Sequence, residues 1–217
     1  MLLGNVDIPD ELLDAQGSGK LVIFAGAGVS MREPSNLPSF KQLAFDAAKE
    51  FGLPYAKKHD PDKILGRLED NHPEVREVRE YVRRRFSSPN SQPNRLHQLL
   101  AQLALITGAA RIVTTNFDAH LSTALGKHSG LAEYVAPALP RGDNFLGVVY
   151  LHGKADSEPD SLVFTDRDFG RAYLTDGWAR RFMVSLFQAF TVLFVGYSHN
   201  DVVLQYLARW LLQGCQR

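Results

Sequence analysis

A glycine-rich turn follows the first apolar run of the chain. Leu21-Val22-Ile23-Phe24 is typical of a buried strand, and Gly26-Ala27-Gly28-Val29-Ser30 comes directly after it. The two glycines let backbone approach a phosphate closely, and Ser30 can add a hydroxyl. Met31 stands where the six-residue dinucleotide pattern has its third glycine. The turn predicts a nucleotide site, with close packing of strand and helix as the alternative.

Polar side chains end a second apolar run. The run Arg111–Thr115 is expected to be a strand, and Asn116 and Asp118 follow it. In open parallel sheets, ligands bind beyond the carboxyl ends of the strands. These two residues are therefore candidates for a polar site, although both residue types also suit helix capping.

A histidine ends a third run in the same way. His152 and Gly153 follow Val148–Leu151, and histidine can act as a base near neutral pH. A structural histidine is the alternative. The other histidines lack this context, and we expect His120 and His128 on or near a polar helix surface.

The run Thr191–Val195 ends in another glycine turn. Gly196-Tyr197-Ser198 offers close backbone approach and a hydroxyl, suited to a second phosphate or an adenosine ribose. A plain connection with Ser198 as a helix cap is the alternative. Together, the four strand ends favour one polar site over four unrelated turns.

These four strands must be held by helices that alternate with them. The pattern predicts an α/β, Rossmann-like fold with a mostly parallel sheet, helices on both faces and no zinc module. Residues 53–93 contain helices and no strand, which indicates a small helical module inserted into one nucleotide-binding domain spanning 1–217. The expected helices are 8–13, 40–51, one beginning at Asp60, 73–86, 96–103, 117–125, 166–174, 178–190 and one from about His199.

The helix expected over 73–86 is rich in charge. We interpret its arginines as a solvated face that the glutamates balance, rather than as a partner surface. The arginines are Arg76, Arg79, Arg83, Arg84 and Arg85, and the glutamates are Glu74, Glu77 and Glu80.

Composition limits the remaining function classes. The 217 residues include 24 basic and 24 acidic side chains, so no overall field favours nucleic acid or an anionic membrane. One cysteine, Cys215, excludes a disulfide framework or a cysteine-built zinc site within the chain. The first residues do not resemble a signal peptide, and no apolar run is long enough to span a bilayer. We expect a cytoplasmic protein.

The four motifs, in this order, resemble the sirtuin superfamily. Gly26 to Ser30 looks like its GAG-x-S nucleotide motif, and Leu37-Pro38-Ser39-Phe40 resembles the flexible loop that follows. Thr115-Asn116-Phe117-Asp118 looks like the Q-N-x-D motif. His152-Gly153 resembles the catalytic HG, and Gly196-Tyr197-Ser198 the late G-x-S. The resemblance runs from about Leu21 to Tyr206.

The departures from deacylating sirtuins point to one branch of that superfamily. The chain cannot build their four-cysteine zinc module, Ser39 and Lys41 replace the acid and arginine of their P-D-F-R loop, and Thr115 replaces their glutamine. These features resemble bacterial SIR2-like domains of antiphage defence proteins. The resemblance implies an N-terminal effector of a longer protein that hydrolyses NAD, forms homo-oligomers and is activated by a sensor domain or partner.

The resemblance also implies residue roles. Asn116 and His152 would be catalytic, the latter as general base. Phe40 would shield the reactive carbon, and Asp118 would orient the site or bind nicotinamide. Gly26, Ala27, Gly28, Gly196, Ser30 and Ser198 would hold the rest of NAD, a substrate rather than a reusable cofactor. No metal is required, because the leaving nicotinamide is cationic in the substrate. An NAD-dependent deacylase and a non-catalytic NAD or ADP-ribose sensor are the alternatives.

Overall fold

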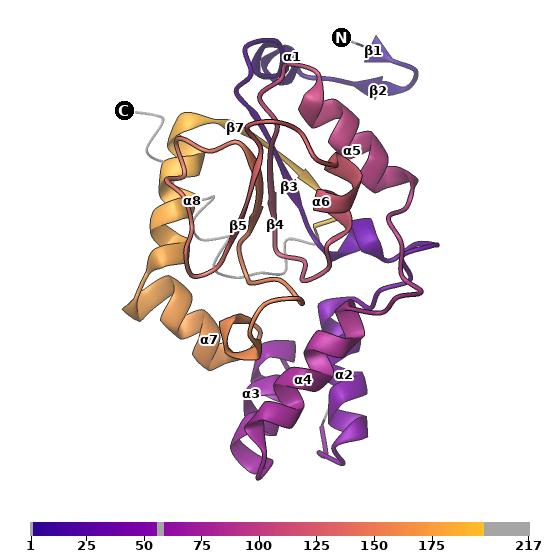
Figure 1. Ribbon diagram of the computed structural model, residues 1–217, viewed down its shortest axis with the longest axis vertical. Helices are drawn as coiled ribbons and strands as arrows, with labels where there is room; N and C mark the ends of the chain where they lie inside the picture. The colour runs from indigo at the N-terminus through magenta and orange to yellow at the C-terminus, as the bar shows by residue number, and fades with distance from the viewer. Residues whose placement is uncertain (1, 56–58, 198–217) are drawn as a thin grey trace.

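The computed structural model describes residues 2–55 and 59–197, and its centre is a five-stranded parallel sheet (Figure 1). The strand order is β5-β6-β4-β3-β7, and every neighbouring pair is parallel. The strands are β3 (Leu21–Ala25), β4 (Arg111–Thr114), β5 (Ala132–Val135), β6 (Gly147–Tyr150) and β7 (Thr191–Val195). The predicted α/β, Rossmann-like class with a mostly parallel sheet is confirmed.

Apolar runs become the inner strands because both faces of the sheet are covered. All five residues of β3 and all four of β6 are buried. β5 was not predicted from the sequence, because this short edge strand begins with two exposed residues and has no continuous apolar run.

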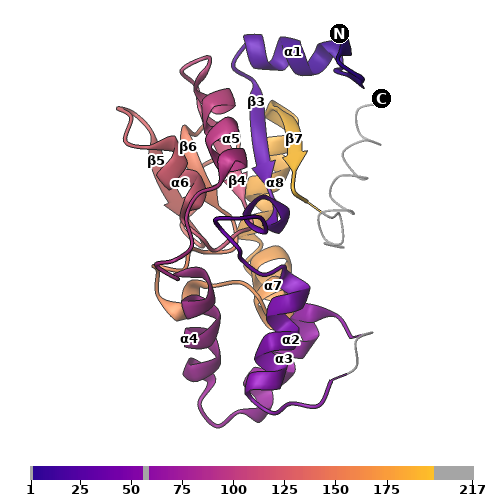
Figure 2. The same cartoon turned by 90° about the vertical axis from the view of Figure 1, so that its right-hand side faces the viewer.

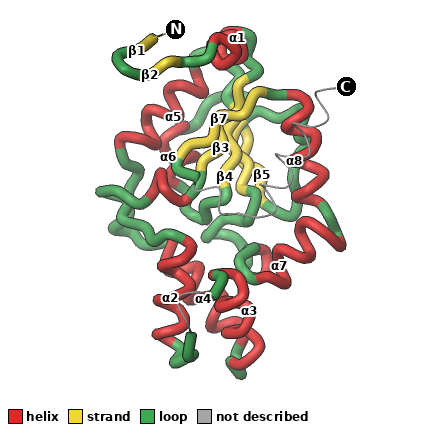
Figure 3. Tube along the Cα trace, turned by 180° about the vertical axis from the view of Figure 1, so that it is seen from behind, coloured by secondary structure: helices red, strands yellow, loops and turns green. Residues whose placement is uncertain are grey.

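Helices cover both faces of the sheet, as the sequence indicated (Figures 1 and 3). Their bounds are α1 (Asp10–Gly17), α2 (Phe40–Glu50), α3 (Pro61–Asn71), α4 (Val75–Phe86), α5 (Arg95–Leu105), α6 (His120–Leu125), α7 (Asp166–Gly170) and α8 (Trp178–Ala189). Shorter turns are η1 (Ala27–Ser30), η2 (Pro159–Ser161) and the π-helical turn η3 (Arg171–Thr175).

Alternate residues of β3 pack into two separate hydrophobic cores. Ile23 packs in the cluster that α5 and α6 cover, which includes Leu100 and Leu121. Phe24 points to the opposite face and packs in the cluster that includes Met183 of α8. This alternation follows from the two-residue period of a strand.

Helices α2, α3 and α4 pack on one another through a third core, and we call them the helical module. Leu43, Leu65 and Val78 are fully buried there, one from each helix. Figure 2 shows the module beyond the carboxyl ends of the strands. α3 and α4 lie within the predicted insertion of about 53–93, and α2 precedes it. The module therefore stands next to the edge at which the four motifs end.

Several details differ from the sequence expectations. Arg79 of α4 is only 7% exposed, so the solvated-face interpretation is wrong for this arginine, although Arg84 is exposed. A short hairpin precedes α1, and each of its strands, β1 (Leu2–Leu3) and β2 (Val6–Asp7), has two residues. Helix α6 begins at His120 rather than at Phe117. The helix expected from His199 lies outside the described residues. No described helix has the length and apolar character to cross a membrane.

Candidate functional site

The register of the sheet brings the four predicted strand ends to one level. Ala25 of β3 pairs with Thr114 of β4 and with Val195 of β7, and Thr114 pairs with Tyr150 of β6. The next residues along all four strands therefore leave the sheet at the same edge. This edge faces the helical module (Figure 2), and it is where parallel sheets hold ligands.

Two glycine turns pack directly on each other at this edge. The backbone N–H of Gly28 donates to Gly196 O at 2.8 Å, and the N–H of Gly26 donates to Val195 O at 3.0 Å. A Cβ at Gly26 or Gly28 would lie 2.8 Å from Gly196 O, and Gly196 itself has φ +64°. All three positions need glycine for this contact alone. Close packing, the alternative interpretation of the turn, therefore accounts for Gly26 and Gly28 in the described conformation.

A buried hydroxyl joins two of the motifs and His97 into one hydrogen-bonded group, the strand-edge network of Ser30, His97, Asn116 and Asp118. The N–H of Asn94 donates to His97 Nδ1 at 3.1 Å, so the ring proton is on Nε2, which donates to Ser30 Oγ at 3.0 Å. Ser30 donates to Asp118 Oδ2 at 2.9 Å and accepts from Asn116 Nδ2 at 3.2 Å. The serine hydroxyl thus uses its one proton and both lone pairs.

This pattern fixes the orientation of the Asn116 amide. Because the Ser30 proton goes to Asp118, only the amide nitrogen of Asn116 can bond Ser30, and Oδ1 points elsewhere. Oδ1 is buried and has no hydrogen-bond partner among the described residues. A buried acceptor without a partner is uncommon in folded proteins and is a position for a ligand's donor group.

Asp118 serves the network and the following helix together. Its Oδ2 accepts from Ser30, and its Oδ1 accepts from the N–H of His120 at 3.0 Å. The capping alternative is therefore present alongside the contact with Ser30. His120 is 7% exposed and its Nε2 contacts Ser91 Oγ at 2.7 Å, so the expectation that it lies on a polar surface is wrong.

His97 is the member of this network that the sequence interpretation missed. It is fully buried, and burial lowers its pKa to about 4, an effect that the charge of Asp118 partly opposes. Asn94 caps α5 and His97 occupies the third helical position, completing a reciprocal capping box. That spacing, Asn followed three residues later by a polar side chain on an apolar helix, was the available signal.

His152 lies in a separate, aromatic pocket. Its Nε2 is 2.9 Å from the Tyr173 hydroxyl, and the Phe169 ring packs edge-on at 5.2 Å between ring centres. Burial lowers the pKa of His152 to about 3, so the ring is neutral at pH 7. Its Nδ1 makes no hydrogen bond to any described residue. The imidazole therefore keeps one nitrogen for another partner.

Phe40 reaches the same pocket from the helical module. Its ring contacts Phe169 edge-on at 6.3 Å, and Phe169 in turn contacts His152. The sequence did not single out Phe169 or Tyr173, because only the folding of α7 and η3 against β6 brings them there.

The structure thus forms two groups from the predicted residues. Ser30, Asn116 and Asp118 are directly hydrogen-bonded, whereas Phe40 and His152 share the aromatic pocket. None of the described hydrogen bonds joins the two groups. Asn116 and His152 each follow a paired residue of neighbouring strands by two positions, so they leave the sheet side by side. Ser198 lies outside the described residues.

The two groups offer complementary chemistry. One presents the amide oxygen of Asn116, which suits a donor group of a polar ligand, and the other presents a neutral imidazole in a largely apolar wall. No three histidine, cysteine, aspartate or glutamate side chains within the described ranges gather as a metal site.

Comparison with known proteins identifies one matching family and two related sequences. Residues 110–217 match the SIR2-like domain family. The uncharacterized protein y4cA of Sinorhizobium fredii (strain NBRC 101917 / NGR234) is 30% identical over 222 residues, covering 93% of this chain and 18% of that protein. Defense-associated sirtuin 2 of Bacillus subtilis is 22% identical over 213 residues, covering 95% of this chain and 20% of that protein. The chain spans about a fifth of the length of these curated relatives.

Proposed function

We propose that this chain, whose residues 110–217 match the SIR2-like domain family, hydrolyses NAD at its nicotinamide–ribose bond. The products are nicotinamide and ADP-ribose. The observation that carries the proposal is the buried Asn116 carbonyl oxygen, which lacks a hydrogen-bond partner among the described residues, beside Ser30 and Asp118, with the neutral His152 just after the end of the neighbouring strand.

The chemistry asks for a site that fixes a sugar and stabilises positive charge on its anomeric carbon. Asn116 Oδ1 accepts a hydrogen bond from the attacking water or a ribose hydroxyl, and the Ser30 bond holds the amide in that orientation. The Asp118 carboxylate provides negative charge close to the reacting sugar. Such preorganised groups commonly supply the largest part of an enzyme's rate enhancement.

His152 supplies the proton acceptor in this mechanism. At pH 7 the ring is neutral, its Nε2 is held by Tyr173, and its Nδ1 takes the proton from water or a ribose hydroxyl. General-base catalysis contributes roughly 10²–10⁴-fold in rate when the pKa of the base lies near the working pH, and the burial that lowers the pKa of His152 makes it a weaker base than that. Phe40 and Phe169 form the apolar wall that excludes other water from the reacting carbon.

The biological role follows from the defence-associated relative. We propose that the chain is the effector part of a longer protein, that it depletes cytoplasmic NAD during phage infection, and that oligomerisation together with a sensor domain or partner controls it. Support for this role comes from the name of the Bacillus subtilis relative and from the much greater length of both relatives.

The test measures free nicotinamide by chromatography after purified protein is incubated with NAD. Asn116→Ala and His152→Ala are expected to reduce release roughly 10²-fold or more. His128→Ala is the matched control, because His128 is exposed, and it should match the wild type.

Other outcomes of this experiment would support a different function. Release that requires an acetyl-lysine peptide would identify a deacylase, and tight NAD binding in calorimetry without any product would identify a sensing module. Equal release from wild type and both site variants would contradict the assignment of Asn116 and His152.

A further inference from the structure

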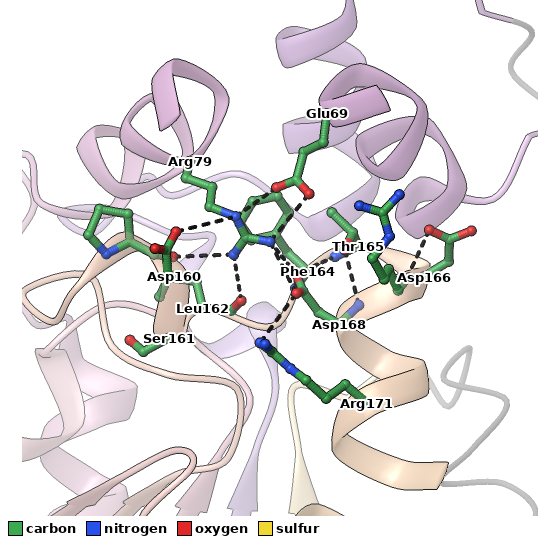
Figure 4. A network of polar contacts seen from close by, with 12 residues as sticks. Glu69, Arg79, Asp160, Ser161, Leu162, Phe164, Thr165, Asp166, Asp168 and Arg171 are labelled. Carbon is green, nitrogen blue, oxygen red and sulfur yellow. Dashed lines mark hydrogen bonds and ion pairs between the residues drawn. The ribbon is translucent and has the colours of Figure 1, made fainter. Parts of the chain in front are cut away.

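A buried arginine connects the helical module to the segment that carries the His152 pocket. Arg79 of α4 places Nε 2.8 Å from Glu69 Oε1 of α3, and its Nη2 donates to both carboxylate oxygens of Asp168 in α7, at 3.1 and 3.0 Å. We call Glu69, Arg79 and Asp168 the junction cluster (Figure 4). All three are buried. Arg171 of η3 also reaches Asp168, at 3.7 Å.

The same guanidinium holds the turn and loop segment 159–163, which runs back past His152. Arg79 Nη1 donates to the carbonyl oxygens of Leu162 at 3.1 Å and Pro159 at 3.3 Å. The next residue, Val163, donates its N–H to His152 O at 2.9 Å. Gly153 packs so closely on this segment that a Cβ would lie 2.9 Å from Ser161 O. Arg79 therefore supports the backbone that pairs with His152.

Asp168, the partner of Arg79, lies in the first turn of α7, the helix whose Phe169 packs on the His152 ring. Its carboxylate accepts from the N–H groups of Phe164 and Thr165, at 3.3 and 3.2 Å, and Thr165 completes the capping box. Phe169 is the next residue, and Tyr173 lies in the following turn. Both contact His152.

We infer that Arg79 is a positioning residue for His152, holding both the backbone beside it and the aromatic pocket around its ring. The inference rests on the proposed function, in which His152 accepts a proton. Its carrying observation is the convergence of one buried side chain on Leu162, Pro159 and Asp168.

The chemistry of the side chain explains why another residue would not substitute fully. A guanidinium carries five N–H donors in a rigid plane, and here it bonds two carbonyls and two carboxylates while its face lies 4.8 Å from the Phe164 ring centre. Lysine keeps the positive charge but lacks the planar arrangement of several N–H donors. Methionine fills similar volume and donates nothing.

The experiment compares Arg79→Met, Arg79→Lys and Asp168→Asn in nicotinamide release. Arg79 contacts none of the predicted NAD-binding residues, so KM should stay within about twofold while kcat falls roughly 10–100-fold in Arg79→Met, as expected for a displaced catalytic group. Arg79→Lys should recover part of kcat. Arg84→Met is the matched control, because this exposed arginine lies on the same helix, and it should leave both constants unchanged.

A second measurement separates this inference from the proposed function. Ring nitrogen resonances of ¹⁵N-labelled histidine, with His152 assigned by its loss in His152→Gln, should shift in the Arg79 and Asp168 variants and stay in place in Arg84→Met. If wild-type protein releases no nicotinamide, the proposed function fails while these resonances still decide the inference. Should Arg79→Met not fold by circular dichroism, Arg79→Lys and Asp168→Asn decide it. Unchanged kcat or unchanged His152 resonances in these folded variants overturn the inference.

Discussion

The strand-edge network and the junction cluster are both buried and polar, but they differ in how their charges and acceptor atoms are compensated. In the junction cluster, the charge of Arg79 faces two carboxylates and two carbonyls. In the strand-edge network, Asp118 carries the formal charge, His97 is neutral, and Asn116 Oδ1 lacks a partner among the described residues. In each region one buried oxygen makes no hydrogen bond, but Glu69 Oε1 lies 2.8 Å from Nε of the Arg79 cation, whereas Asn116 Oδ1 faces no described donor. We interpret the charge-compensated cluster as one that holds structure, and the uncompensated Asn116 oxygen as a position for a ligand.

The largest effect on stability should come from breaking the junction cluster. Arg79→Met leaves Glu69 and Asp168 buried without their cation, which costs about 3–5 kcal/mol in the free energy of unfolding. Urea unfolding measures this change. Arg84→Met, exposed on the same helix, should stay within about 0.5 kcal/mol of wild type. Equal stability of Arg79→Met and Arg84→Met would contradict the structural role given to the junction cluster.

The second-largest effect is expected from acid, which should lower the stability contributed by the strand-edge network. The pKa of His97 is lowered from 6.5 to about 4 in the folded protein, so the unfolded chain takes up the proton first as the pH falls. The contribution of His97 is complete above pH 6.5 and is lost as the pH falls from 6.5 toward 4, by on the order of 3 kcal/mol.

Unfolding curves collected across that pH range test the assignment. His97→Gln should flatten the decline, and the part that persists belongs to other groups, including His152, whose pKa is lowered to about 3. A pH profile that is the same in His97→Gln and wild type would contradict the role given to His97.

A smaller effect is expected at the centre of the strand-edge network. Ser30→Ala removes the shared partner of His97, Asn116 and Asp118, and unpaired buried groups cost about 1–3 kcal/mol. Thermal unfolding gives the stability, and nicotinamide release should fall because the Asn116 amide is no longer oriented. Ser18→Ala, at an exposed hydroxyl, is the control. Full activity in Ser30→Ala would show that Asn116 needs no such support.

The smallest effect should follow Tyr173→Phe, which keeps the ring and removes the hydroxyl that contacts His152 Nε2 at 2.9 Å. Loss of one buried hydrogen bond costs about 1 kcal/mol. Calorimetric unfolding compares this variant with Tyr134→Phe, a half-buried tyrosine on the edge strand β5. A cost as large as that of Arg79→Met would place the structural support at Tyr173 instead.

Four strands and the polar residues that end them could be predicted from the sequence, because a buried strand needs an apolar run and its end needs polar groups. β5 could not, since an edge strand with exposed residues lacks that signal. His97, Tyr173 and Arg79 were missed for another reason. Their partners lie far away along the chain, as Ser30, His152 and Asp168 do, and no local pattern specifies those pairs.

The sequence by itself determined four of the parallel strands and the helices between them, the α/β class and the four motifs at the strand ends, because periodicity and turn residues are local properties. Only the tertiary structure decided that Gly26 and Gly28 serve close packing on Gly196. It also decided that the Asn116 oxygen is open, that His152 is neutral, and that Arg79 is buried. Burial and hydrogen-bond pairing set the protonation and orientation of each side chain. Both depend on which distant segments of the chain pack together.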